Sequence, residues 1–424
     1  MRRFFLWGAA IAVPALVLIV WATNFRGSDA IADLPPTVPP TNGQVARGAY
    51  LARAGNCMLC HTERGGAAYA GGRPLETPFG TIFAGNLTPD AETGIGRWSA
   101  AHFRRALHEG RSRDGRLLYP AFPYTHTTRV TGADADALFD YLRSLPPVKK
   151  ANQAHRLRWP YSTQAALAVW RTLYFERGPH VDDTARTPEW NRGAYLVRGL
   201  GHCGACHSAR NALGATADLT DLSGGLIPMQ NWYAPSLSAP EEAGVSVWPL
   251  HEIEQLLATG VSPRGTVLGP MAEVVMHSLQ YLEPADVRAM AVFLKDLPPT
   301  ASDTDPREVP QAAAAVMTRG GKLYEQHCAQ CHGTQGEGVR GAYPPMAGNR
   351  AVTMRVTTNL VQVVLHGGFA PATRGNPRPF GMPPFATTLS DAEVADVLTY
   401  VRTSWNNRAA PVSELHVTQQ RSAR

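Results

Sequence analysis

Apolar residues recur at helical spacing in three similar blocks of the chain. Each block closes on an amphipathic segment that starts with acidic residues, and prolines follow the first two of these segments. A shorter helical segment that ends in glycine comes before each closing segment, as a glycine C-cap predicts. The pattern indicates a mainly α fold, without strand-like alternation. The closing segments are residues 134–148, 284–300 and 391–407.

A third short helix is expected at the start of each block. It carries an Arg-Gly pair and a tyrosine, and the motif Cys-x-x-Cys-His follows it, at spacings of 146 and 125 residues. Three repeats of this order predict three tandem domains in a chain of 424 residues. We expect domains at 45–150, 189–300 and 317–408, linkers at 151–188 and 301–316, and a polar tail at 409–424.

Residues 1–25 have the pattern of a membrane anchor or signal segment. Two arginines precede about nineteen almost wholly apolar residues, Phe4–Ala22, a length that can cross a bilayer. We favour a retained anchor, and the alternative is cleavage after Ala30. Both interpretations keep the arginines in the cytoplasm and export the rest of the chain. Residues 26–44 are expected to form a stiff, proline-rich spacer.

Charge and composition exclude several function classes. The net charge of +6 is scattered along the chain, so a nucleic-acid partner is not expected. All six cysteines lie in the three motifs, which leaves none for disulfides between distant segments. The sequence shows no nucleophile beside a base, no motif with paired carboxylates and no phosphate-binding glycine loop. We therefore expect a protein that is not an enzyme by itself.

Cys-x-x-Cys-His is the attachment signature of c-type haem. The two cysteines reach the two vinyl groups of one porphyrin, and the histidine is the proximal ligand of the iron. A zinc site would need further cysteine or histidine pairs, and a redox Cys-x-x-Cys is expected in a strand–helix–strand setting; neither is found. The motifs predict three covalently bound haem c groups, held by Cys57, Cys60 and His61, by Cys203, Cys206 and His207, and by Cys328, Cys331 and His332.

An electron-transfer haem needs a second axial ligand, and methionine is the common choice. Met271 and Met382 lie in the loops that precede the closing helices of the second and third blocks, where the opposite face of each haem is expected. Met290 falls inside a closing helix and is expected to pack in the core. The alternatives are Met229 and Met276 in the second block and Met346 in the third.

The first block has no methionine outside its attachment motif. Phe122 stands in the corresponding loop at the place where a methionine is expected, and His126 follows four residues later. We favour His126 as the distal ligand over His102 and His108, which lie on the middle helix. Two histidine ligands would give this haem a lower potential than the other two, and would favour it as the first electron acceptor.

Four stretches of the chain resemble the triheme cytochrome c subunits of bacterial membrane-bound dehydrogenases. They are "NLTPDAETGIGRWSAAHFRRAL", "LYPAFPYTH", "GPMAEVV" and "YPPMAGNRAV…FGMPPFATTLSDAEVADVLTYVR", and the resemblance runs from about Arg47 to Asn407. It implies three tandem cytochrome c-like domains, the nine attachment and proximal residues given above, and Met271 and Met382 as distal ligands. Several relatives carry methionine at the position of Phe122, so the ligand of the first haem does not transfer.

The resemblance also implies a setting for the protein. It would lie on the periplasmic side of the cytoplasmic membrane, receive electrons from a catalytic dehydrogenase subunit, and deliver them to ubiquinone or another respiratory acceptor. Relatives accompany subunits that carry molybdopterin, pyrroloquinoline quinone (PQQ) or flavin. The form "PAFPYTH" favours a molybdopterin aldehyde or N-heterocycle dehydrogenase, with PQQ alcohol dehydrogenase next. The alternatives of another class are a multihaem peroxidase, which would keep one iron open, and a haem subunit of a terminal oxidase.

Overall fold

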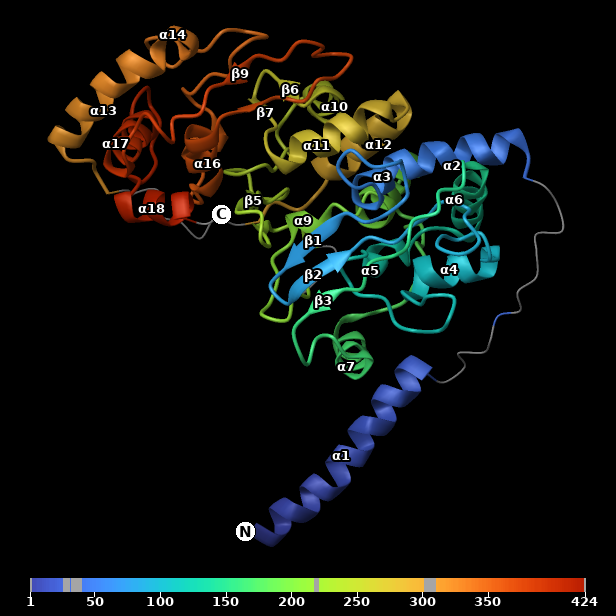
Figure 1. Ribbon diagram of the computed structural model, residues 1–424. Helices are drawn as coiled ribbons and strands as arrows, with labels where there is room; N and C mark the ends of the chain where they lie inside the picture. Colours follow the sequence, from blue (N-terminus) through green and yellow to red (C-terminus); the bar gives the residue numbers. More distant parts are fainter. Residues whose placement is uncertain (1, 26–30, 32–39, 217–220, 301–309, 423–424) are drawn as a thin grey trace. The chain divides into compact units, whose positions relative to one another are not determined.

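The computed structural model describes the chain except residues 1, 26–30, 32–39, 217–220, 301–309 and 423–424, and the side chains of residues 2–13 (Figure 1). Most of the expected spacer at 26–44 and of the expected linker at 301–316 therefore lies outside the described residues. The chain forms two compact units. Unit 1 comprises residues 1–181, 197–205 and 210–219, and unit 2 comprises residues 182–196, 206–209 and 220–424.

Unit 1 is mainly helical, as the sequence predicts, with one small antiparallel sheet in the order β1-β2-β3. Its elements are α1 (Arg2–Phe25), α2 (Asn42–Ala54), α3 (Cys57–His61), β1 (Pro74–Thr77), β2 (Gly80–Phe83), α4 (Ala100–Glu109), α5 (Tyr124–Thr127), α6 (Gly132–Ser144), β3 (Arg156–Leu157) and α7 (Gln164–Tyr174).

The second and third sequence blocks supply the helices and hairpins of the remaining chain. From the second block come α8 (Pro188–Tyr195), η1 (Leu196–Leu200), α9 (Gly204–His207), β4 (Gly225–Ile227), β5 (Trp232–Ala234), α10 (Leu250–Thr259), β6 (Val261–Ser262), β7 (Gly265–Thr266), α11 (Pro270–His277), η2 (Leu279–Tyr281) and α12 (Pro284–Lys295). From the third come α13 (Ala314–His327), α14 (Ala329–His332), α15 (Arg350–Thr353), α16 (Thr358–His366), β8 (Gly368–Phe369), β9 (Gly381–Met382), α17 (Asp391–Thr403) and α18 (Glu414–Ser422).

The opening and closing helices of each block pack against each other, as α2 with α6, α8 with α12 and α13 with α17 (Figure 1). An arginine of the opening helix donates from Nε to an aspartate of the closing helix, at 2.6–2.8 Å in all three pairs. The aspartate side chains are the buried partners, so each ion pair orients one helix on the other. The pairs are Arg47–Asp134, Arg192–Asp286 and Arg319–Asp396.

The glycine after each of these arginines lets the two helices touch. A Cβ on Gly48 would lie 1.9 Å from the carbonyl oxygen of Ala137, and one on Gly193 would lie 2.0 Å from that of Ala289. Gly320 has the same relation to Asp396, at 2.3 Å. The Arg-Gly pair that the three blocks share thus marks the point where the opening and closing helices cross. Only glycine allows the backbone of the closing helix to come this close to the opening helix.

The middle helices end at the glycines that the sequence predicts. Gly110 after α4 and Gly260 after α10 have φ values of 57° and 76°, and each N–H bonds back to its helix. Gly367 after α16, with φ of 66°, also bonds back, to Val363. A hairpin or an isolated bridge follows each of these helices. These strands are too short for a period-2 pattern, so no alternation along the chain indicates them.

Helix α1 ends against α7 in unit 1. Asn24 is buried, and its Nδ2 donates to the carbonyl oxygen of Ala168 at 3.1 Å and to Thr172 Oγ1 at 2.9 Å. Among the described residues, we find no helix that is both long and apolar enough to cross a membrane. The membrane anchor expected at residues 1–25 stays a prediction.

Two segments that we expected to be a linker and a tail carry structure. Residues 151–188 contain β3 and α7, whose Leu167 and Ala168 form a small core with Leu117. Residues 409–424 contain α18, in which Val417 is fully buried against the third block.

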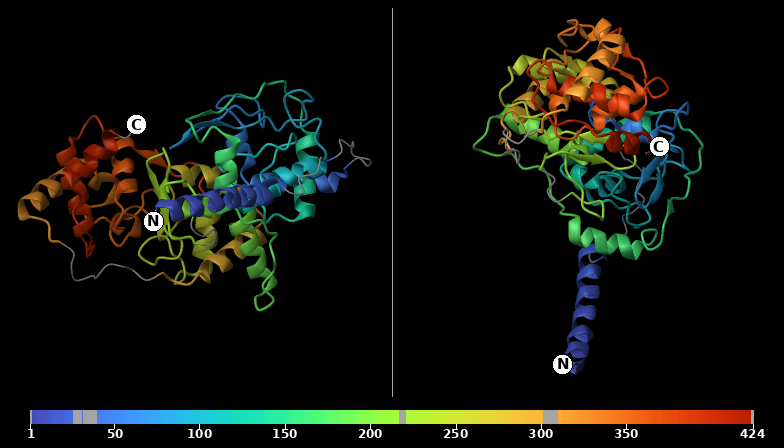
Figure 2. Two further views of the ribbon diagram at one scale, coloured as in Figure 1. Left: turned by 90° about the horizontal axis from the view of Figure 1, so that it is seen from below. Right: turned by 90° about the vertical axis from the view of Figure 1, so that its left-hand side faces the viewer.

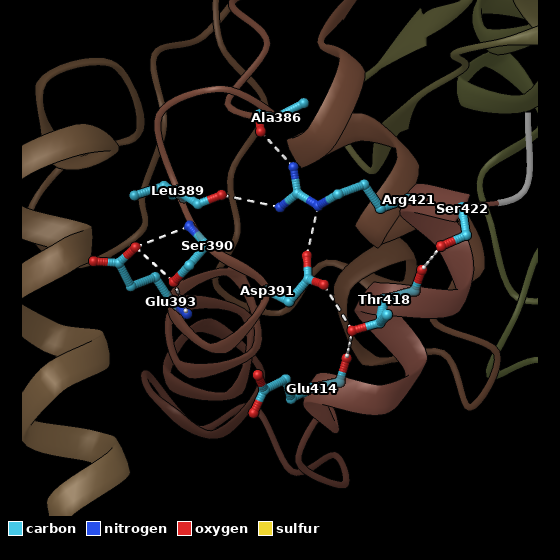
Figure 3. A network of polar contacts seen from close by, with 9 residues as sticks. All are labelled: Ala386, Leu389, Ser390, Asp391, Glu393, Glu414, Thr418, Arg421 and Ser422. Atoms are coloured by element: carbon cyan, nitrogen blue, oxygen red, sulfur yellow. Dashed lines mark hydrogen bonds and ion pairs between the residues drawn. The ribbon is translucent and has the colours of Figure 1, made fainter.

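Figure 3 shows how α18 is held on the start of α17. Arg421 Nε donates to Asp391 Oδ1 at 2.5 Å, and Thr418 Oγ1 donates to the other oxygen of the same carboxylate at 2.6 Å. Arg421 also donates to the carbonyl oxygens of Ala386 and Leu389. The end of the described chain is thereby fixed to the third block.

Candidate functional site

Each Cys-x-x-Cys-His motif ends in a histidine whose Nδ1 contacts a backbone carbonyl. The distances are 2.7 Å from His61 to Gly85, 2.7 Å from His207 to Pro235, and 3.0 Å from His332 to Pro344. A carbonyl oxygen only accepts, so Nδ1 carries the proton in all three rings. The lone pair is then on Nε2, which is the tautomer that ligates a metal through Nε2.

Burial keeps these imidazoles neutral. It lowers the pKa of His61, His207 and His332, and the bond to the carbonyl opposes this shift only in part. Neutral imidazole is the form that binds iron. The proximal histidines that the sequence predicts thus have the tautomer and charge that the role requires.

A glycine holds the histidine backbone in the same way in all three blocks. The N–H of Gly71, Gly224 and Gly338 donates at 2.8 Å to the carbonyl oxygen of His61, His207 and His332, respectively. All three glycines have positive φ, and a Cβ on any of them would lie 2.6 Å from backbone atoms next to the carbonyl that holds the imidazole. Sequence reasoning did not single out these glycines.

Two of the attachment cysteines, Cys57 and Cys328, have raised thiol pKa values. Burial, with a smaller contribution from the neighbouring Cys60, raises the pKa of Cys57 to about 12. Burial, followed by Cys331, raises the pKa of Cys328 to about 11. Redox-active and metal-binding cysteines are instead thiolates with lowered pKa values. These side chains suit thioether attachment better than zinc binding or disulfide exchange.

The candidate distal methionines of unit 2 lie on short, tightly held segments. Met382 is in β9, which pairs with β8, and it packs with the cluster around Val361 and Leu365. Its rival Met346 instead packs against the cluster of Tyr324, Val352, Val397 and Val401, against which Cys328 of the attachment motif also packs. The second candidate, Met271, lies in the first turn of α11, directly after a hairpin.

The other methionines of the second block have different surroundings. Met290 is 3 % exposed inside α12, where core packing was predicted. Met229 is 64 % exposed in a turn, so its side chain faces solvent. Met276 is half-buried on α11, and its carbonyl accepts a bond from Gln280. Met271 and Met276 are both half-buried on α11, a helix where the sequence predicted a loop, and Met271 as the distal ligand stays a prediction.

His126 in unit 1 has the features of a histidine that can ligate a metal. It lies in α5, between the middle and closing helices, and is only 2 % exposed. Its Nδ1 lies 3.2 Å from Thr125 Oγ1, whereas its Nε2 is buried and has no hydrogen-bond partner among the described residues. An orphaned buried nitrogen is costly unless a ligand engages it. Burial lowers the pKa of His126 to about 3, so the ring is neutral.

The two alternative histidines lie on α4. His102 Nδ1 lies 2.8 Å from Ser99 Oγ in a capping box, which gives this ring a structural role at the start of the helix. His108 shares with His126 a buried Nε2 that has no hydrogen-bond partner in the described part of the chain, but it is less buried. Burial lowers its pKa as well. Phe122 stands just before α5 and contacts Tyr124.

The residues present fit a covalently bound haem. Each motif offers two cysteines and a histidine with the metal-binding tautomer, and unit 1 holds a buried nitrogen that lacks a partner among the described residues.

A sequence model of the family described as cytochrome c matches residues 45–146 and 317–405. The cytochrome c subunit of quinone alcohol dehydrogenase from Gluconacetobacter polyoxogenes is 38 % identical over 409 residues, which cover 92 % of this chain and 86 % of that subunit.

The chain belongs to the cytochrome c family. Its relatives place it with the cytochrome subunits of membrane dehydrogenases. The gluconate 2-dehydrogenase cytochrome c subunit of Pantoea cypripedii is 37 % identical, with 86 % of each chain covered. A subunit of nicotinate dehydrogenase from Pseudomonas putida is 42 % identical over 405 residues, which cover 93 % of this chain. The chain spans only 33 % of the length of that protein.

Membership of this family confirms the role that the sequence predicts. The chain is an electron-transfer cytochrome rather than a catalytic subunit, and its cytochrome c domains bind haem c covalently. The model of the family matches the first and third blocks. The second block has the same helix pair, the same imidazole-to-carbonyl bond and the same glycine contact.

Proposed function

We propose that the chain carries three haem c groups and passes electrons from a catalytic dehydrogenase subunit to ubiquinone or another acceptor of the respiratory chain. The observation that carries the count is the threefold recurrence of one frame: an imidazole held by a carbonyl, and its own backbone held by a glycine. When bound, each haem iron supplies one-electron transfer by changing its oxidation state. The chain positions the irons and sets their potentials.

The chain's own residues then have distinct tasks. The cysteine pairs attach the groups, and His61, His207 and His332 hold the iron on one side. Met271 and Met382 are the distal ligands of the second and third sites, where a thioether raises the potential. His126 takes this place in the first site, supported by its buried Nε2, and so lowers the potential of that site.

The catalytic partner is a dehydrogenase subunit, since the named relatives are subunits of such enzymes. We favour a molybdopterin enzyme that oxidises an aldehyde or an N-heterocycle. The support is the loop around Phe122 and the 42 % identity to a subunit of nicotinate dehydrogenase, whose substrate is an N-heterocycle. A PQQ alcohol dehydrogenase is the next candidate.

The location that we propose is the periplasmic side of the cytoplasmic membrane, with α1 as a retained anchor. Four consecutive apolar residues of α1, Leu16–Ile19, are each more than half exposed, so unit 1 does not bury them. The same helix is fixed to unit 1 at its C-terminal end through Asn24. A lipid environment would accommodate the exposed apolar residues.

Two measurements test the proposal. Intact mass after expression with a cytochrome c maturation apparatus should show three covalent haems, and Cys203→Ser with Cys206→Ser should remove one of them. Two haems in the unchanged chain, or no loss in the double variant, would refute the count. Purification of the membrane complex should recover a large subunit whose cofactor identifies the dehydrogenase. A complex that reduces peroxide without such a subunit would contradict the assigned role.

A further inference from the structure

The outer face of α7 is apolar. One side of the helix is buried, with Leu167 and Ala168 in a small core. On the other side Val169 and Leu173, spaced by four residues, are 41 % and 60 % exposed. A helix on the surface of a water-soluble domain normally places polar residues there. The apolar face of α7 is therefore oriented toward something other than the core of unit 1.

Further exposed aromatic and aliphatic residues precede α7 in the chain or contact it. Trp159, just before α7, is 82 % exposed, and the exposed Tyr161 rests on the ring of Phe79 at 4.5 Å between centroids. At the other side Trp170 Nε1 donates to the carbonyl oxygen of Leu213 at 2.9 Å, and the Leu213 side chain is exposed. We call this set the α7 surface, made of Trp159, Tyr161, Val169, Leu173 and Leu213.

Helix α7, which carries Val169 and Leu173 of the α7 surface, contacts the apolar helix α1 through its other residues. Figure 2 shows α7 lying crosswise at the C-terminal end of α1. The joint is specific, because Asn24 donates to Ala168 and Thr172, and Arg171 Nε donates to Asn24 Oδ1 at 3.1 Å. Val20 of α1 packs on the same small core as Leu167. The joint thus fixes the direction of α1 relative to α7.

We propose that the α7 surface lies in the interfacial layer of the bilayer that α1 enters. This inference rests on the proposed anchoring of the chain by α1. An apolar helix that enters a membrane brings whatever lies crosswise at its outer end to the level of the lipid headgroups. Tryptophan and tyrosine are enriched at that level, and a helix with one apolar face binds there in the plane of the membrane.

Charge next to the surface fits lipid as the occupant. Arg156 and Arg158 lie within three residues before Trp159, and Arg177, which pairs with Glu109 at 3.0 Å, follows α7 with its side chain 64 % exposed. Arginines beside an apolar face suit anionic lipid headgroups. The consequence is that unit 1 is held against the membrane by two elements, a helix that enters it and a helix that lies on it, so that its attachment site keeps a fixed orientation to the bilayer.

Spin labels on the full-length, haem-loaded chain test this in vesicles of phosphatidylcholine and phosphatidylglycerol. The native cysteines are consumed by haem attachment, so Val169→Cys and Leu173→Cys give single labelling positions. Val181→Cys, at a residue that is 79 % exposed outside the α7 surface, is the matched control. Val17→Cys reports on α1. The measurement is label relaxation by oxygen, which concentrates in lipid, against relaxation by a water-soluble nickel complex.

We expect labels at 169 and 173 to favour oxygen over nickel by several-fold relative to the label at 181. Labels at 169 and 173 that match the label at 181, while the label at 17 reports lipid, would overturn the inference and leave the anchor intact. If the label at 17 also reports water, the anchoring fails and the inference with it. Labels at 169 and 173 that both reagents fail to reach would show that protein covers this face, which also overturns it.

Discussion

The backbone of Ala137 in α6 passes so close to Gly48 in α2 that a Cβ on the glycine would lie 1.9 Å from the carbonyl oxygen of Ala137. The same contact joins the opening and closing helices of the other two blocks. These helix pairs lie next to the attachment motifs in the chain, because each motif starts within eight residues of the end of the opening helix. The spacing of the pair thus sets where the first cysteine stands.

Gly48→Ala should therefore destabilise unit 1. The added methyl forces α2 away from α6, at a cost of about 1–3 kcal/mol for an overpacked contact. Gly43→Ala in the same helix is the control, because its nearest neighbour would be 3.9 Å away. This change should be neutral or stabilise by up to about 0.5–1 kcal/mol. Hydrogen exchange of α2 and α6 gives the local opening energies, and equal effects of the two variants would contradict the assigned contact.

The ion pair beside this contact predicts a second effect of similar size. Asp134 is almost fully buried and bonds to Arg47, whereas Asp136 on the same helix is exposed and pairs with Arg104. Asp134→Asn should cost about 1.5–3 kcal/mol, because a buried charge-assisted bond is lost. Asp136→Asn should change the opening energy of α6 by less than about 1 kcal/mol. Similar losses in both variants would show that burial of Asp134 does not matter.

Much of the helical frame could be predicted from the sequence, because it depends on local signals. The first two closing helices have an aspartate in their first turn and stop before proline, and α4 and α10 end at glycines with positive φ, as the pattern indicates. The motifs carry their chemistry in five consecutive residues, which is why the attachment and proximal positions follow without a structure.

The partners of the proximal histidines could not be predicted, because the chain leaves the motif and returns at variable distances. The carbonyl that holds the imidazole is 24 residues from His61, 28 from His207 and 12 from His332. The supporting glycines also stand at different distances, as Gly71 and Gly338 do from their histidines. An alignment of the three blocks on the motif alone therefore misses them. Helix α18 could not be predicted for another reason: its sequence is mostly polar, and few of its residues are apolar and pack on the third block.

The orphaned nitrogen of His126 predicts a spectroscopic change. His126→Ala should leave the first haem high-spin or labile, because the distal ligand that we propose is lost. His108→Ala removes another imidazole of unit 1 whose Nε2 is buried without a hydrogen-bond partner among the described residues, and it should keep the low-spin spectrum. Absorption and electron paramagnetic resonance spectra of both variants decide between them. A high-spin signal in His108→Ala alone would transfer the ligand role to α4.

The two methionines of the third block predict different redox behaviour. Met382→His should lower the midpoint potential of one haem, because imidazole replaces a thioether that raises it. Met346→Ala should leave the haem potentials unchanged and only loosen the packing of the cluster that contains Tyr324 and Val352. Spectroelectrochemical titration resolves the steps of the three haems that we propose. A shifted potential in Met346→Ala, with none in Met382→His, would exchange the two assignments.

The network in Figure 3 predicts that α18 is held in a pH-dependent way. The Thr418 hydroxyl, with a further contribution from Arg421, holds the pKa of Asp391 below its usual value although burial opposes the shift. A carboxyl with a lowered pKa stabilises the folded state above its unfolded pKa of about 3.9, and this stabilisation is lost as the pH falls through the lower, folded value. The docking of α18 should therefore be full at neutral pH and weaken only in acid.

Asp391→Asn tests this docking directly. At pH 7 it should lower the hydrogen-exchange protection of α18 by the loss of charged bonds, about 1.5–3 kcal/mol, and the gap to the unchanged chain should close below about pH 4. Glu414→Gln changes the same helix at its exposed start and should leave protection within about 0.5 kcal/mol. Because protection factors correct for the intrinsic pH dependence of exchange, a gap that stays constant from pH 7 to pH 3 would show that the carboxylate charge of Asp391 does not hold α18.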